Sequence, residues 1–289
     1  MIVYLNGNYL PLEDAKISVL DRGFIFGDAV YEVWRGVRGK LFEPDMHLAR
    51  LANGLRDTVI SPPPESKRDG LLAISDRLHK ENGFNGESSL FLEMSRGVAP
   101  RGHAYPKPPV PPTVFIMAAA FTPPEELRAT GAGVICIDDV RWTRCNVKTT
   151  QLLPNVMAKQ AAAEKGLLDA IFIRDGMVTE TSHANVMAVI DGVVRTHPVG
   201  ESVLPGVTRD VVLEIARSMK IKVKEKPFSK AELKKAEEIF LTGTLSDVMP
   251  IVTVDGKKIG KGRPGPISQQ LFKALRERLD KVGAASARA

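Results

Sequence analysis

Hydrophobic residues recur along this chain in two spacings, and each spacing predicts a different kind of element. Alternating, β-rich stretches such as 29–37 predict strands. The spacing of Leu48, Leu51 and Leu55 predicts a helix over 43–59. The same criteria predict a hairpin over 2–9, strands at 88–96, 113–121, 133–142, 168–174 and 184–190, and helices at 66–81, 152–165, 208–219 and 266–281.

This mixture of elements predicts an α+β fold with two domains. The paired prolines of Phe121-Thr122-Pro123-Pro124-Glu125-Glu126 are typical of a linker. We therefore expect a small N-terminal α/β domain at 1–120, a linker at 121–126 and a larger domain at 127–289. Because clefts between domains commonly hold active sites, an active site is expected there.

Composition and charge exclude several classes of protein. The 289 residues are 44% hydrophobic and 26% charged, which is ordinary for a globular protein. The net charge of +6 is dispersed, and the mixed run 222–235 is typical of solvated surface, so nucleic-acid binding is not expected. Two cysteines, no Cys/His cluster, no leader pattern and no membrane-length apolar run predict a cytoplasmic protein without a metal site.

A lysine and a glutamate are the strongest candidates for chemistry. Lys148 lies in an uncharged stretch at a predicted strand-to-helix junction, and Glu180 lies near the end of a later strand. A deprotonated lysine attacks an aldehyde to form an imine, and a carboxylate keeps a cofactor ring nitrogen protonated. Taken singly, Lys148 could be an ordinary lysine at a helix start and Glu180 a surface or capping glutamate.

Phosphate anchoring has candidates in two turns and one helix. The stretch 206–210 (Gly-Val-Thr-Arg-Asp) opens a predicted helix, whose N–H groups and dipole favour an anion. The turn 242–244 (Thr-Gly-Thr) supplies further hydroxyls, and Arg50 could add a bidentate clamp. Each signal alone is weak, because such turns and helix arginines are common in other roles.

Six ordered blocks resemble the class IV (fold type IV) pyridoxal-phosphate aminotransferases, and the D-amino acid enzymes of that family most closely. The blocks fall between Asp21 and Asp255, at 21–33, 47–51, 144–153, 179–186, 204–209 and 242–244. The resemblance implies a fold type IV enzyme whose larger domain has a barrel-like β core and whose cofactor lies in the cleft between the two domains. It implies Lys148 as the imine lysine, Glu180 at the pyridine nitrogen, Leu204 behind the ring, and Arg50, Val207, Thr208 and Thr244 around the phosphate.

Substrate recognition centres on the stretch 96–103, which resembles the Arg-x-His element of D-amino acid aminotransferases. In that family the element binds the substrate carboxylate together with a tyrosine, which implies Arg101, His103 and Tyr31 here. The family's loop reaches the neighbouring subunit, so the resemblance also implies a homodimer. Branched-chain aminotransferases usually have Phe-Glu-Gly where this chain has Tyr-Glu-Val at 31–33, which favours the D-amino acid interpretation.

The expected reaction is a ping-pong transamination through a Lys148 aldimine, from a D-amino acid to a 2-oxo acid, with D-alanine and 2-oxoglutarate as the expected pair. Alternatives on the same scaffold are a branched-chain L-amino acid aminotransferase and 4-amino-4-deoxychorismate lyase. A basic binding protein that has lost the chemistry is an alternative of another class. His183, Ala184 and Gly243 depart from the serines usual at these positions, which leaves the cofactor affinity and substrate range open.

Overall fold

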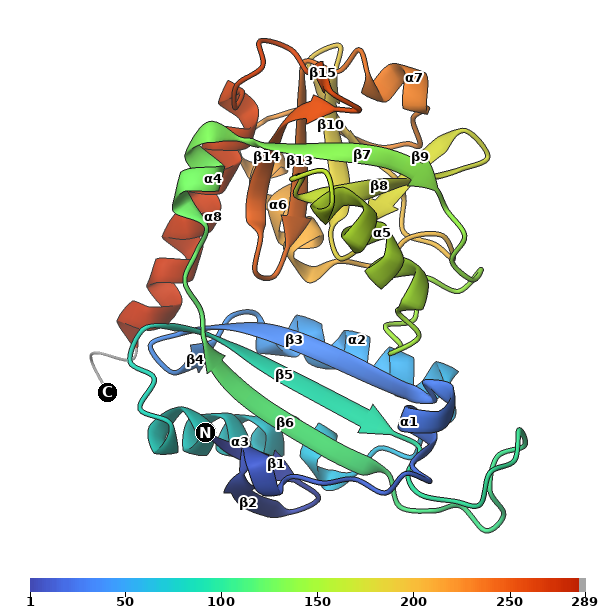
Figure 1. The fold of residues 1–289 in the computed structure, drawn as a ribbon. Coiled ribbons are helices and arrows are strands. Elements are labelled where there is room, and N and C mark those ends of the chain that lie inside the picture. Colours follow the sequence, from blue (N-terminus) through green and yellow to red (C-terminus); the bar gives the residue numbers. More distant parts are fainter. Residues whose placement is uncertain (286–289) are drawn as a thin grey trace. The chain divides into compact units, whose positions relative to one another are not determined.

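The computed structural model describes residues 1–285, and they form two compact units (Figure 1). The first unit contains Met1–Thr122, Val147–Gln151 and the C-terminal stretch from Leu279. The second contains Pro123–Asn146 and Leu152–Arg278. The short segment Val147–Gln151 thus belongs to the first unit, although the chain on both sides of it belongs to the second. The domain limits expected from the sequence, 1–120 and 127–289, remain a prediction.

The first unit is built on an antiparallel six-stranded sheet in the order β2-β1-β6-β5-β3-β4. Asn6 and Gly7 have φ angles of 48° and 90°, which these two residue types tolerate best, so the predicted hairpin is confirmed. The strands are β1 (Ile2–Leu5), β2 (Asn8–Pro11), β3 (Ala29–Val37), β4 (Lys40–Leu41), β5 (Glu87–Ser95) and β6 (Thr113–Ala120).

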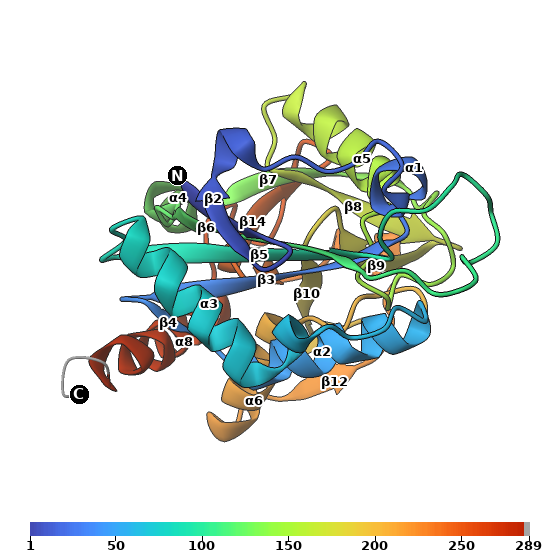
Figure 2. The same cartoon turned by 90° about the horizontal axis from the view of Figure 1, so that it is seen from below.

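Two amphipathic helices, α2 (Pro44–Asp57) and α3 (Arg68–Glu81), cover one face of this sheet (Figure 2). They confirm the helices predicted at 43–59 and 66–81. The leucines of both helices pack with Trp34 of β3 and Leu90 of β5 in one buried core. The shorter helices of this unit are α1 (Arg22–Phe26), η1 (Leu12–Asp14) and η2 (Pro64–Ser66).

The second unit contains a closed β-barrel, which confirms the expected barrel-like core. Its sheet has nine strands, and an extra pairing of β9 with β10 closes β10, β13, β14, β7, β8 and β9 into a ring. The strands are β7 (Ala132–Asp138), β8 (Asp169–Arg174), β9 (Met177–Thr181), β10 (Asn185–Ile190), β11 (Val193–Thr196), β12 (Val223–Glu225), β13 (Glu238–Gly243), β14 (Asp247–Val254) and β15 (Lys257–Lys258).

Alternate side chains of the ring strands point inward and form one apolar cluster that includes Val134, Ile171, Val186, Leu241 and Met249. Outside the ring, α5 packs its alanines on Phe172 of β8. The helices are α4 (Glu125–Thr130), α5 (Leu153–Ala163), α6 (Val207–Ser218), α7 (Lys230–Leu233) and α8 (Pro266–Ala285). Within the described chain, no helix combines the length and apolarity needed to cross a membrane.

We expect Leu90→Ala to destabilise the first unit by about 2–5 kcal/mol, because Leu90 is 0% exposed and the truncation leaves a cavity in the core. Urea unfolding followed by far-UV circular dichroism measures the change. Leu12→Ala is the matched control, since Leu12 is 41% exposed and should cost no more than about 0.5 kcal/mol. Equal midpoints for the two variants would contradict the assignment of Leu90 to the core.

Candidate active site

Lys148 lies in an extended segment beside the first residues of β3. The backbone N–H of Tyr31 donates to the carbonyl of Lys148 at 3.0 Å, and Thr149 forms an isolated bridge with Val30. The side chain of Lys148 is half-buried, and its Nζ lies 4.1 Å from the centroid of the Tyr31 ring. Two predicted site residues are therefore in direct contact, because an ammonium group is attracted to the face of an aromatic ring.

Arg50 of α2 is held by a buried carboxylate that sequence reasoning did not include. Its Nε and Nη2 donate to the two oxygens of Glu32 at 2.8 and 2.6 Å. Nδ1 of His47 lies 3.1 Å from the same carboxylate, and Glu32 is completely buried. Glu32 and His47 stand inside the family-like blocks 21–33 and 47–51, so the sequence contained them without assigning them a role.

The electrostatics of this group follow from its burial and its charges. Burial alone would raise the pKa of Glu32, but the Arg50 guanidinium and the His47 hydrogen bond hold that pKa well below its usual range. Burial lowers the pKa of His47, and the positive charges of Arg50 and Lys148 lower it further. The hydrogen bond and negative charge of Glu32 raise this pKa, but they do not reverse the net decrease. Arg50 is therefore fixed in orientation as a cation with a permanent counter-ion.

Arg101 and His103 lie on an exposed loop of the first unit. In the described chain their side chains contact one aromatic ring, that of Phe26, with the Arg101 guanidinium carbon and the His103 ring centroid each 5.6 Å from its centroid. Among the described residues, neither Arg101 nor His103 forms a ring contact or an ion pair with Tyr31 or Lys148. The structure thus brings Lys148 and Tyr31 together, whereas Arg101 and His103 lie against Phe26.

Glu180 owes its orientation to a β-bulge in the second unit. Ile173 of β8 pairs with Val178 of β9, and Ile171 pairs with Thr181. Between these two pairs, β9 has one residue more than β8. Val178 points into the barrel core, whereas Glu180 pairs with Asn185 on the outer face. Without the extra residue, strict alternation would place Glu180 on the same face as Val178.

The Glu180 carboxylate is buried and hydrogen-bonded on both oxygens. Arg141 donates to Oε1, while the Asn185 amide and the Leu204 backbone N–H donate to Oε2 at 3.2 and 3.0 Å. Burial raises the pKa of Glu180, and the adjacent Arg141 opposes that rise. A carboxylate of this kind has a stronger affinity for a proton than one in water.

Arg141 belongs to a buried ionic network that the sequence did not reveal. Its Nη2 lies 2.8 Å from Oδ2 of Asp139, which is also 3.1 Å from Nη2 of Arg174. The pKa of Asp139 is lowered, because these two arginines outweigh the effect of its burial. The strand predicted at 133–142 included this stretch, but β7 ends at Asp138. The sequence did not predict the network, because it is assembled by tertiary contacts from three separate segments.

Leu204 lies beside this carboxylate, and Val207 and Thr208 are the first two residues of α6, which begins shortly after it in the chain. The carbonyl of Leu204 accepts from the Asn185 amide at 3.0 Å, so Asn185 bridges Glu180 and Leu204. Gly206 precedes α6, and a Cβ at that position would lie 2.0 Å from Oδ1 of Asn185. Only glycine permits the backbone to approach Asn185 this closely. The first N–H groups of α6 are thereby placed near Asn185, which binds Glu180.

The ends of β10 and β13 complete the group. Asn185 pairs with Thr242, so their side chains share the outer face with Glu180, and the Thr242 hydroxyl has no hydrogen-bond partner among the described residues. Gly243, directly before Thr244, lies beside Ala184, because a Cβ at Gly243 would be 3.5 Å from the Ala184 Cβ. His183 lies 3.0 Å from the buried Asp169, which explains how a histidine is accommodated in this turn.

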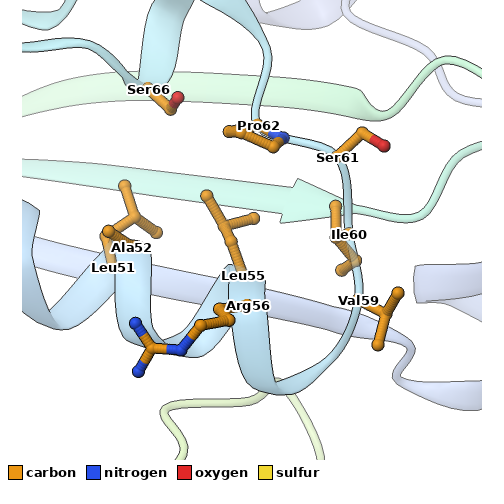
Figure 3. A pocket seen from close by; sticks show the side chains of 9 residues that line it. All are labelled: Leu51, Ala52, Leu55, Arg56, Val59, Ile60, Ser61, Pro62 and Ser66. Atoms are coloured by element: carbon orange, nitrogen blue, oxygen red, sulfur yellow. The ribbon is translucent and has the colours of Figure 1, made fainter.

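A cavity of about 400 Å³ also occurs in the first unit (Figure 3). It lies between the second half of α2 and the segment that follows it. None of the predicted site residues lines it. The lining residues are Leu51, Ala52, Leu55, Arg56, Val59, Ile60, Ser61, Pro62 and Ser66.

Comparison with known proteins identifies relatives over almost the whole chain. The family "Amino-transferase class IV" matches residues 29–254. A D-alanine aminotransferase of Staphylococcus epidermidis is 38% identical over 270 residues, which is 93% of this chain and 94% of the relative. The branched-chain amino acid aminotransferase of Escherichia coli has the same fold, with a TM-score of 0.88 at 24% identity over 96% of this chain and 93% of that one. A T.th. branched-chain amino acid aminotransferase with pyridoxamine 5'-phosphate has a TM-score of 0.87 at 26% identity, over 98% and 94% of the two chains.

The depressed pKa of Glu32 predicts a specific dependence of stability on pH. Its folded pKa lies below the unfolded value of about 4.3, so its contribution is present above that pH and is lost as the pH falls toward the folded pKa. Glu32→Gln should therefore cost about 3 kcal/mol at pH 7, with a deficit that shrinks below pH of about 4. Urea unfolding at several pH values measures both curves.

The matched control is Asp45→Asn, because Asp45 and Arg68 form the same type of pair with side chains 71% and 53% exposed. This variant should differ from the parent by no more than about 0.5 kcal/mol at every pH. Parallel stability curves for the parent and Glu32→Gln would show that the buried pair does not behave as described.

Proposed function

Because this chain belongs to the class IV aminotransferase family and is an aminotransferase, we propose that it transfers an amino group from a D-amino acid to a 2-oxo acid. D-alanine is the proposed donor and 2-oxoglutarate the proposed acceptor. The observation that carries the proposal is the half-buried Lys148 amine over the Tyr31 ring, in a chain similar to a D-alanine aminotransferase. The Tyr-Glu-Val sequence at 31–33 supports the same substrate class.

Class IV aminotransferases use pyridoxal phosphate, and the residues of this chain fit that group. The buried Glu180 is suited to a protonated ring nitrogen. The glycine-led start of α6 and the Thr242 hydroxyl, which has no hydrogen-bond partner within residues 1–285, are suited to a phosphate. When bound, the cofactor supplies an electron sink for the substrate carbanion. We propose Lys148 as its covalent attachment point, Glu180 at its ring nitrogen, Leu204 behind its ring, and Arg50, Val207, Thr208 and Thr244 around its phosphate.

The residues of this chain would then act as follows. Deprotonated Nζ of Lys148 accepts the proton from the substrate Cα and donates it again in the return step, first as general base and then as general acid. The Glu180 carboxylate would accept a hydrogen bond from the protonated ring nitrogen, and its burial would strengthen that interaction. Tyr31, Arg101 and His103 would bind the substrate carboxylate through a phenol, a guanidinium and an imidazole.

Two alternatives on the same scaffold are distinguished by substrate. A branched-chain aminotransferase would act on L-amino acids, and 4-amino-4-deoxychorismate lyase would release pyruvate without an amino acceptor. Assays with D-alanine and L-alanine, with chiral analysis of the glutamate formed, separate these activities from the proposed one. A binding protein without chemistry would show no cofactor absorption in the visible spectrum. The proposed enzyme should show such an absorption band, and treatment with borohydride should remove it.

We also propose that the protein is a homodimer in the cytoplasm. Exposed apolar side chains precede and enter α1, including Val19 at 73% and Phe24 at 69% exposed. Val98, at the base of the loop that carries Arg101 and His103, is 43% exposed and forms a bridge with Asp21. Exposed apolar side chains next to that loop are suited to contact with a second subunit. The free thiols of Cys136 and Cys145 are compatible with a reducing compartment.

Lys148→Ala should reduce the transfer from D-alanine to 2-oxoglutarate by about 10³-fold or more, because it removes the group that moves the Cα proton. Coupled detection of pyruvate measures the rate. Lys165→Ala is the control, since Lys165 is an exposed lysine that should leave the rate unchanged. A Lys148→Ala protein that transfers amino groups at the parent rate would refute the assignment.

Subunit complementation tests whether Arg101 and His103 serve the neighbouring active site. We expect inactive Lys148→Ala and inactive Arg101→Ala/His103→Ala proteins to regain about a quarter of the parent activity when they are refolded together in equal amounts. About half of the dimers are then mixed, and one of the two sites in each mixed dimer is intact. If the loop instead serves its own subunit, the mixture stays inactive.

A further inference from the structure

The loop 97–112 contains no helix or strand, yet two buried arginines and a partly buried aspartate hold it. We call Arg22, Asp28 and Arg96 the Asp28 cluster. The two arginines are 4% and 7% exposed, and their guanidinium groups share the carboxylate of Asp28. These three residues have no place in the chemistry proposed above, so their burial requires another explanation.

Arg22 connects Asp28 with the backbone of the loop. Its Nε donates to Oδ2 of Asp28 at 2.8 Å, and its Nη1 donates to the carbonyl of Gly102 at 2.6 Å. Longer contacts of 3.4 Å reach the carbonyls of His103 and Ala104. Three consecutive carbonyls thus face one guanidinium, at the residues that follow Arg101 and include His103.

Arg96 supports the same loop from its base. Nε and Nη2 of Arg96 donate to the two oxygens of Asp28 at 2.7 and 2.9 Å, and its guanidinium lies 3.6 Å from the centroid of the Tyr105 ring. It also donates to the carbonyls of Thr58 and Val59 at the end of α2. Asp28 therefore connects two arginines: Arg22, which binds the loop backbone, and Arg96, which binds the end of α2.

The charges of the Asp28 cluster keep this arrangement ionised. Burial would raise the pKa of Asp28, but hydrogen bonds and charge from Arg96 and Arg22 lower it below its ordinary value. The Asp28 carboxylate consequently stays charged at neutral pH and keeps the guanidinium groups of Arg22 and Arg96 oriented. Because an irregular loop loses conformational entropy when it is ordered, such contacts are needed to fix side chains that project from it.

We propose that Arg22 and Asp28 are positioning residues for substrate recognition: they fix the backbone of 102–104 so that Arg101 and His103 are presented in one geometry to the substrate carboxylate. This inference rests on the proposed function, because it assumes that Arg101 and His103 bind that carboxylate. A binding group displaced by about 1 Å loses much of its contribution, so loosening the loop should weaken substrate binding.

The first test is Arg22→Lys in the cofactor-loaded protein. Lysine keeps the charge but has no planar fork, so it cannot bind Asp28 and the Gly102 carbonyl together. Hydrogen exchange of the amides in 98–112 should accelerate by about tenfold or more. The KM for D-alanine should rise by about tenfold, with kcat within about twofold and the visible cofactor band unchanged. Arg56→Lys is the matched control, because the Arg56 side chain is 71% exposed.

A double-mutant cycle separates positioning from general loss of structure. Since Arg22 would act through Arg101 and His103, adding Arg22→Lys to an Arg101→Ala protein should raise the KM by clearly less than about tenfold, because only the His103 contribution then remains to be lost. A full tenfold effect in that background would overturn the inference, as would unchanged loop exchange in Arg22→Lys. Asp28→Asn, which preserves shape and removes the charge, gives the same readouts if Arg22→Lys does not fold.

The outcomes also distinguish this inference from the proposed function. A parent protein that does not transfer amino groups from D-alanine refutes the proposed function, whatever the loop exchange shows. A parent that is active, with an Arg22→Lys variant whose loop and KM are those of the parent, refutes only the positioning role.

Discussion

The closure of the barrel through the pair Glu180–Asn185 is the constraint on which the second unit depends. This pair joins β9 to β10 and so completes the ring, and its side chains lie on the outer face because β9 contains a bulge. Asn185 then ties Glu180 to Leu204 and leaves room only for glycine before α6. One cross-strand pair thus determines where the carboxylate, the helix start and the Thr242 hydroxyl meet.

Two buried carboxylates, Glu32 in the first unit and Glu180 in the second, have opposite electrostatic properties. At Glu32, the interactions with Arg50 and His47 outweigh the effect of burial, so the pKa is lowered. Glu32 therefore remains a charged counter-ion for Arg50. The pKa of Glu180 is raised, because burial outweighs Arg141 and because Asp139 takes part of that arginine's charge. A fixed anion is suited to orienting an arginine, whereas a carboxylate with a raised pKa is suited to sharing a proton.

Sequence periodicity predicted the long elements well, because each buries one regular face. The helices at Pro44–Asp57 and Arg68–Glu81 lie where leucine spacing placed them. The short strand β11 and the helices α1 and α4 were not predicted, since they are too short for a periodic signal. The bulge before Glu180, the network around Arg141 and the Asp28 cluster could not be predicted either, because each depends on contacts between distant segments.

The start of β3 links the parts of the first unit that bear on function. The carbonyl of Asp28 accepts from the N–H of Arg96, while Tyr31 binds the Lys148 segment through its backbone. The next residue, Glu32, points to the opposite face and holds Arg50. A shift of β3 by one residue would exchange the faces of Tyr31 and Glu32, separating the lysine from its aromatic neighbour and burying a phenol against α2. The full nine-residue pairing of β3 with β5 fixes this register, so the sheet itself determines which side chains meet Lys148.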